Sequence, residues 1–140
     1  MYDLQRFLKA QERDYNTALK EIRNGRKMSH WIWFIFPQVK GLGISSTSEY
    51  YGIEDIKEAR AYLDNKTLRS RLLEISAALL DLDTSDARQV MGSPDHLKLR
   101  SSMTLFAVAD PDIPVFREVL DKYYNGVMDE KTLNIINKRR

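Results

Sequence analysis

The sequence predicts an all-α protein, a compact orthogonal bundle of about eight or nine short helices. The first observation is that apolar residues recur every three or four positions along most of the chain, which is the period of an amphipathic helix. The second is that residues that start or end helices stand at short intervals, so the connections span only a few residues. The third is size, because 140 residues make one ordinary domain and no linker or repeat divides residues 1–140.

The beginning of the chain carries the pattern of one long helix or of two shorter ones. Apolar residues recur at helical spacing over residues 4–22, and Asp3 and Gly25 can start and end the helix. Between residues 10 and 15 polar side chains fill the pattern, and Asp14 can cap a second helix there. We therefore predict two helices in this segment.

Residues 27–38 form the most aromatic stretch of the chain and contain both tryptophans. Ser29 can cap a short helix over residues 30–36, and Pro37 disfavours helical geometry at the residue before it. A strand is the alternative, since tryptophan, isoleucine and phenylalanine favour strands. We predict a helix because no other segment offers an obvious strand to pair with this one.

The rest of the chain alternates between apolar periods and residues that interrupt helices. Gly41-Leu42-Gly43 and the serines after it form a loop by composition. The predicted helices are one turn capped by Ser46 or Ser48 and reaching Tyr51, residues 54–63, residues 68–80, a short helix capped by Ser85 and closed by Gly92, a helix with Ser93 as its cap and Pro94 at its first position, a helix that starts at Pro114 and ends at Gly126, and a last helix capped by Asp129.

The near balance of charge limits the partners that the sequence predicts. The chain has 22 basic and 20 acidic residues and a formal net charge of +2, so nucleic-acid binding is not predicted. The longest apolar run covers residues 31–37 and is too short to cross a bilayer, so no membrane segment is predicted.

Few residues of the chain are suited to metal or redox chemistry. The lack of cysteine removes disulfides, thiolate nucleophiles and thiolate metal sites, and it fits a cytoplasmic protein. His30 and His96 belong to no His-x-x-x-His or Glu-x-x-His pair, so no metal site is predicted. Gly41-x-Gly43 lacks the remaining residues of a phosphate or dinucleotide motif and is typical of a tight turn, so no cofactor is predicted.

Basic and polar side chains stand beside the aromatic residues of the 27–38 stretch. Flat aromatic walls with a few polar groups are typical of small-molecule or base-stacking sites. The alternative is that both tryptophans are core residues whose indole N–H groups have partners inside the protein. The ligand-binding candidates in this stretch are Lys27, His30, Trp31, Trp33 and Gln38.

A second polar set lies in the helix predicted after Ser93. Its members are Lys98, Arg100, Ser101, Ser102 and Thr104. Lys98 and Ser102 share a helix face at i and i+4, with Ser101 beside them. Consecutive serines in mid-helix are mildly unfavourable, so they indicate either close helix packing or a polar lining. Lys98, Ser101 and Ser102 therefore join the ligand-binding candidates, and the sequence assigns no catalytic residue.

A resemblance to a known family is carried by the run Gly25-Arg26-Lys27-Met28-Ser29-His30-Trp31-Ile32-Trp33-Phe34-Ile35-Phe36-Pro37-Gln38 and by Asp95-x-x-Lys98-Leu99-x-Ser101-Ser102-Met103-Thr104-Leu105-Phe106. On these motifs nearly the whole chain resembles an uncharacterised bacterial family, the domain of unknown function numbered 1810. The resemblance implies an all-α fold and no particular activity. Members are often labelled calpastatin, but calpastatin inhibitory segments are disordered and rich in proline, whereas this chain has four prolines and a periodic core.

The favoured function is binding of a small anionic or nucleotide-like ligand at an aromatic and basic cleft, with or without processing of that ligand. In this hypothesis a tryptophan stacks on a ring, and Lys27 and Lys98 meet negative charge. His30 or Ser101 supplies hydrogen bonds or proton transfer. The alternative is a non-catalytic protein-interaction module with an aromatic groove near Trp31. The sequence is compatible with an enzyme and with a binding protein, and it predicts no oligomeric state.

Overall fold

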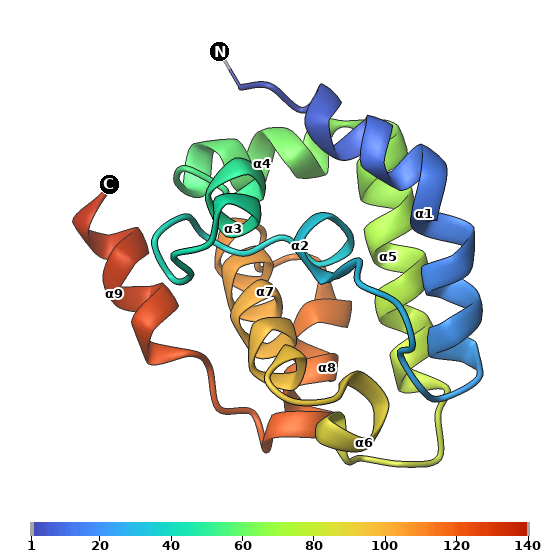
Figure 1. Ribbon diagram of the computed structural model, residues 1–140. Coiled ribbons are helices and arrows are strands. Elements are labelled where there is room, and N and C mark those ends of the chain that lie inside the picture. The colour runs from blue at the N-terminus through green and yellow to red at the C-terminus, as the bar shows by residue number, and fades with distance from the viewer. Residues whose placement is uncertain (1, 140) are drawn as a thin grey trace.

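Helices make up most of the architecture of residues 2–139, the part of the chain that this computed structural model describes (Figure 1). In chain order they are α1 (Gln5–Arg23), α2 (Ile32–Ile35), α3 (Ser46–Tyr51), α4 (Ile56–Asp64), α5 (Lys66–Leu80), α6 (Ala87–Met91), α7 (Asp95–Ala109), α8 (Pro114–Tyr124) and α9 (Glu130–Lys138). The described residues include no β-strand, and their one strand-like pairing is a parallel bridge between Val39 and Ile53. The predicted all-α class is confirmed.

The first helix is one continuous element, so the prediction of two helices divided at Asp14 is wrong. The polar residues in the middle of α1 do not break the helix. One of them, Gln11, is only 1% exposed and has hydrogen-bond partners inside the protein. The Gln11 Nε2 donates to the Phe34 carbonyl oxygen at 2.8 Å and to the Tyr62 hydroxyl at 2.9 Å. A buried amide with two partners thus occupies a core position that the apolar pattern leaves vacant.

The aromatic stretch forms a single turn, α2, which is shorter than the predicted helix over residues 30–36. The predicted cap is also wrong, because the Ser29 hydroxyl donates to the Glu21 Oε2 at 2.6 Å and does not bond to the helix. Trp31 occupies the N-cap position without a side-chain hydrogen bond. The turn ends before Pro37, as predicted.

Several predicted helix starts are displaced by a residue or two because a neighbouring side chain makes the cap. The observed caps are Ser45 for α3, Asp55 for α4, Asn65 for α5 and Asp86 for α6, and each accepts a hydrogen bond from a backbone N–H of the first turn. Helix α7 begins at Asp95 with Pro94 at its N-cap, so Ser93 is not the cap. The predicted start of α8 at Pro114 and the predicted cap of α9 at Asp129 are confirmed.

Helix α7 is the central helix of the bundle and packs against α8, α4, α6 and α9. Helices α1 and α5 lie side by side on one flank, and α9 lies on the opposite flank (Figure 1). Because neighbours surround α7, most of its residues are buried and it lacks a single apolar face. Through the core runs a chain of aromatic rings, Phe7, Tyr62, Phe106 and Phe116, with successive centroids 5.2, 5.2 and 5.7 Å apart.

The fold brings together three segments that are far apart in the sequence: residues 38–48, the first half of α7, and residues 127–131 at the start of α9. The other end of α9 is also attached, because the Arg139 Nη1 donates to the carbonyl oxygens of Lys40 at 2.8 Å and Glu54 at 3.1 Å. No helix within residues 2–139 has the length and apolar character that crossing a membrane requires.

Candidate functional site

A cleft of about 540 Å³ lies where residues 38–48, the first half of α7 and the start of α9 meet. This volume is in the range of pockets that hold small molecules. The polar residues in its wall are Gln38, Ser48, Lys98, Arg100, Ser101, Asp129, Glu130 and Lys131. Three of these are cations and two are carboxylates, so the wall has a small excess of positive charge.

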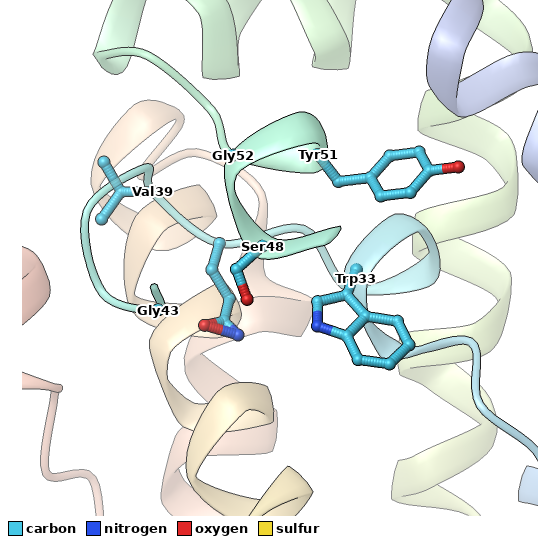
Figure 2. Close-up of a pocket in the computed structure, with 7 residues that line it drawn as sticks. Trp33, Val39, Gly43, Ser48, Tyr51 and Gly52 are labelled. Carbon is cyan, nitrogen blue, oxygen red and sulfur yellow. The ribbon is translucent and has the colours of Figure 1, made fainter. Parts of the chain in front are cut away.

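A narrow cavity of about 10 Å³ adjoins the cleft and shares Gln38, Gly43 and Ser48 with its wall. This is the space of roughly one water molecule. Figure 2 shows the nitrogen edge of Trp33 turned toward the Ser48 side chain. The Trp33 Nε1 is buried and has no hydrogen-bond partner within residues 2–139. A Cβ at Gly43 would lie 2.5 Å from the Ser48 Oγ, so this close approach of the loop requires glycine.

Ser101 and Asp129 connect α7 to the start of α9 in the wall of the cleft. The Ser101 Oγ lies 2.9 Å from the Asp129 Oδ2 and 3.1 Å from the Leu97 carbonyl oxygen, so two acceptors share its proton. The Asp129 Oδ2 also accepts from the Thr132 backbone N–H at 3.2 Å, and the Asp129 N–H donates to the Thr104 hydroxyl at 2.9 Å. Asp129 is therefore a helix cap that fixes α9 against α7.

Lys98 and Arg100 bring positive charge from α7 to the cleft. The Lys98 Nζ lies 3.6 Å from the Asp95 Oδ1 and 5.1 Å from the centroid of the Trp33 ring. The Arg100 Nη2 lies 3.7 Å from the Asp129 Oδ1, which is a loose ion pair, and the Arg100 Nε is buried without a partner in the described structure. Both side chains keep N–H donors that can bind an anion.

Three buried side-chain atoms of residues 2–139 lack a hydrogen-bond partner, and two of them belong to residues that line the cleft or the narrow cavity. They are the Trp33 Nε1, the Arg100 Nε and the Ser102 Oγ. Trp33 lines the narrow cavity, Arg100 lines the cleft, and Ser102 lies one helical turn from Lys98. A buried polar group without a partner costs about 1–3 kcal/mol, so folded proteins contain few of them. The two such groups beside the cleft and the narrow cavity, together with the cations in the wall, make the cleft the candidate site.

Lys27 and Trp31 belong to a separate cluster on the other side of Asp95. The Lys27 Nζ lies 2.7 Å from the Asp95 Oδ2 and 5.0 Å from the centroid of the Trp31 ring. Trp31 is 1% exposed, and its Nε1 donates to the Glu21 Oε1 at 2.9 Å. Both side chains have partners inside the protein, and neither lines the cleft.

Glu21 holds the loop before α2 through four hydrogen bonds. Its carboxylate accepts from the backbone N–H groups of Met28 and Ser29, the Ser29 hydroxyl and the Trp31 Nε1, at 2.6 to 2.9 Å. Partial burial opposes ionisation of this carboxyl, but the hydrogen bonds outweigh it and lower the pKa of Glu21 from 4.5 to about 2.

The lowered pKa of Glu21 predicts acid sensitivity. Its contribution to stability is fully present above about pH 4.5, the unfolded value, and is lost as the pH falls toward 2. We expect the thermal unfolding midpoint of the wild type to fall more steeply across this range than that of Glu21→Gln, measured by circular dichroism. Equal slopes for the two proteins would contradict this role of Glu21.

Comparisons with known proteins place the chain in a family. The family described as "Protein of unknown function (DUF1810)" matches residues 1–136. The chain belongs to the DUF1810 family. It is similar to the conserved hypothetical protein Rv1873 from Mycobacterium tuberculosis, whose crystal structure matches with a TM-score of 0.95 and 42% identity over 97% of each chain. No curated protein matches the sequence. The family resemblance predicted from the aromatic motif is confirmed.

This DUF1810 fold brings four of the predicted residues to one place. Lys98 and Ser101 line the cleft, Trp33 lines the narrow cavity beside it, and Gln38 lines both. Ser102 is fully buried on α7.

The structure separates the other candidates from the cleft. Lys27 forms an ion pair with Asp95, and Trp31 donates to Glu21, as described above. His30 is exposed and lines neither the cleft nor the narrow cavity. The candidates within residues 27–38 are therefore close in the sequence but do not all lie at one place in the structure.

Several polar residues of the cleft, among them Arg100, Lys131 and Asp129, were not among the ligand-binding candidates. Arg100 stands between Lys98 and Ser101, so its position on the helix was a usable signal. Lys131 comes from another segment, and no local pattern points to it. Asp129 was predicted as a helix cap, which it is, and its contact with Ser101 depends on tertiary structure. Within residues 2–139 no group of three or more histidine, aspartate or glutamate side chains is placed to hold a metal ion.

Proposed function

We propose that this DUF1810 protein binds a small anionic molecule in the cleft between α7, α9 and residues 38–48. The observation that carries the proposal is the pair of buried donors without partners, the Trp33 Nε1 and the Arg100 Nε, in the walls of two adjoining cavities. Lys98 and Lys131 add positive charge to the same wall. An anion in the cleft offsets this charge, and the narrow cavity beside it has room for one water molecule that can accept from the Trp33 Nε1.

The start of α9 supports the same assignment. The backbone N–H groups of Glu130 and Lys131 belong to the first turn of the helix, where no preceding turn supplies acceptors. The partial positive charge of a helix N-terminus favours an anion nearby. The Asp129 carboxylate opposes this field less than a free carboxylate would, because Ser101, Thr132 and Arg100 surround it.

The wall of the cleft is suited to recognise the anionic group of a ligand and not a stacked base. The Trp31 ring is buried, and one face of the Trp33 ring is covered by the Lys98 ammonium group. A nucleotide-like ligand fits the proposal through its phosphate. An aromatic groove for a partner protein near Trp31 has no support, since Trp31 and Phe34 are 1% and 4% exposed.

Calorimetric titration with inorganic phosphate, pyrophosphate and adenosine monophosphate tests the proposal. We expect at least one of these anions to bind the wild type, and we expect Arg100→Gln to weaken that binding about tenfold or more. The reason is that a charge-assisted hydrogen bond contributes about 1.5–3 kcal/mol.

The control for this experiment is Arg117→Gln, which removes the same charge from an exposed position on α8. Its affinity for the anion should equal that of the wild type. No binding by any of the three anions, or equal losses in Arg100→Gln and Arg117→Gln, would contradict the proposed site.

A further inference from the structure

The mouth of the cleft is apolar as well as cationic. Leu97 and Val127 line the cleft although they are 47% and 56% exposed, and Ile44, at 99% exposed, follows the wall residue Gly43. A single exposed apolar side chain is normal for a protein surface. Several around one concavity are typical of a binding surface.

The apolar and cationic groups come from the same elements and lie next to each other. Leu97 precedes Lys98 on the first turns of α7, and Val127 lies two residues before the cap of α9 at Asp129. Half-buried Leu42 completes this side of the wall. A ligand that binds the cations by its anionic group therefore has apolar surface within reach for the rest of its structure.

We propose that the ligand of this cleft is an amphipathic anion, a phosphate or carboxylate that carries an apolar chain or ring. The anionic group binds at Lys98 and Arg100, and the apolar part covers Leu97 and Val127. This inference rests on the proposed function, since it names the chemical class of the ligand for the same site. A highly polar anion would leave the exposed apolar surface of Leu97 and Val127 in contact with water.

A series of alkyl phosphates tests the inference, with inorganic phosphate, ethyl phosphate, butyl phosphate and hexyl phosphate as the probes. A fully buried methylene favours binding by about fourfold, and in an open cleft we expect roughly twofold to threefold for each methylene. Affinity should therefore rise steadily along the series in the wild type, measured by calorimetry.

Two variants locate the apolar part of the ligand. Leu97→Ser and Val127→Ser should reduce the gain in affinity for each methylene, because each substitution removes apolar surface from the wall of the cleft. Both positions are exposed, so the variants should fold, which thermal unfolding checks. The matched control is Met28→Ser, which removes a side chain that is 72% exposed and lies outside the cleft wall.

The outcomes separate this inference from the proposed function. Equal affinity for inorganic phosphate and all alkyl phosphates would overturn the amphipathic ligand and leave anion binding in place. A rise along the series that Leu97→Ser and Val127→Ser do not reduce would also overturn it, because the apolar part would then bind elsewhere. Failure of every anion to bind would overturn the proposed function itself.

Discussion

Glu58→Ala should lower the free energy of unfolding by about 3–5 kcal/mol, because it leaves a buried charge without its partner. The Glu58 Oε2 lies 3.0 Å from the Arg6 Nη2, and the two side chains are 4% and 9% exposed. The other carboxylate oxygen of Glu58 accepts from the Glu54 backbone N–H at 2.7 Å. The same arginine donates to the carbonyl oxygens of Tyr50 at 2.8 Å and Gly52 at 3.0 Å, so it cannot turn outward without further loss.

Urea unfolding of the wild type, Glu58→Ala, Arg6→Ala and the double variant measures this effect. Since each single variant leaves one charge unpaired, the double variant should lose less stability than the sum of the two single losses. A loss of about 1 kcal/mol or less in Glu58→Ala would show that the pair behaves like a surface salt bridge.

Trp31→Ala should also cost about 3–5 kcal/mol, because it empties a large core position. The side chain is 1% exposed, its ring centroid lies 6.2 Å from that of Phe36, and its Nε1 donates to Glu21. Truncation removes this packing and one of the four hydrogen bonds that hold the Glu21 carboxylate.

Trp33→Ala is the matched comparison for Trp31→Ala. Trp33 is half-buried and its Nε1 has no partner among the described residues, so its truncation should cost clearly less. Urea unfolding of both variants decides the point. Equal losses, or a larger loss for Trp33→Ala, would contradict the assignment of Trp31 to the core and Trp33 to the wall of a cavity.

Most of the fold follows from the helical period of the apolar residues and from the residues that cap helices. The errors in the predicted helices have identifiable causes. The break predicted in α1 came from polar residues, but Gln11 is buried there because Phe34 and Tyr62, distant in sequence, bond to its amide. The cap predicted at Ser29 failed because Glu21 competes for the same hydroxyl. Both errors come from tertiary partners, which a local pattern does not contain.

The candidate site was accessible from the sequence only in part. Lys98 and Ser101 share one helix, so their common lining of the cleft follows from helical spacing. In the aromatic stretch, Trp31 and Trp33 are close in the sequence but have different surroundings. Trp31 contacts Glu21, whereas Trp33 lies against Lys98. The opposite wall of the cleft comes from residues 127–131, and no sequence spacing relates these residues to α7.

The central claim, anion binding in this cleft, is tested most directly through the two indole N–H signals of the protein in a nuclear magnetic resonance titration. Lys98 lies over the Trp33 ring and also lines the cleft, whereas the Trp31 N–H is bonded to Glu21. Addition of the anion that binds best in calorimetry should therefore move the Trp33 signal, assigned with Trp33→Phe, and leave the Trp31 signal in place. A Trp33 signal that stays fixed at saturation, or movement of the Trp31 signal alone, would contradict the account.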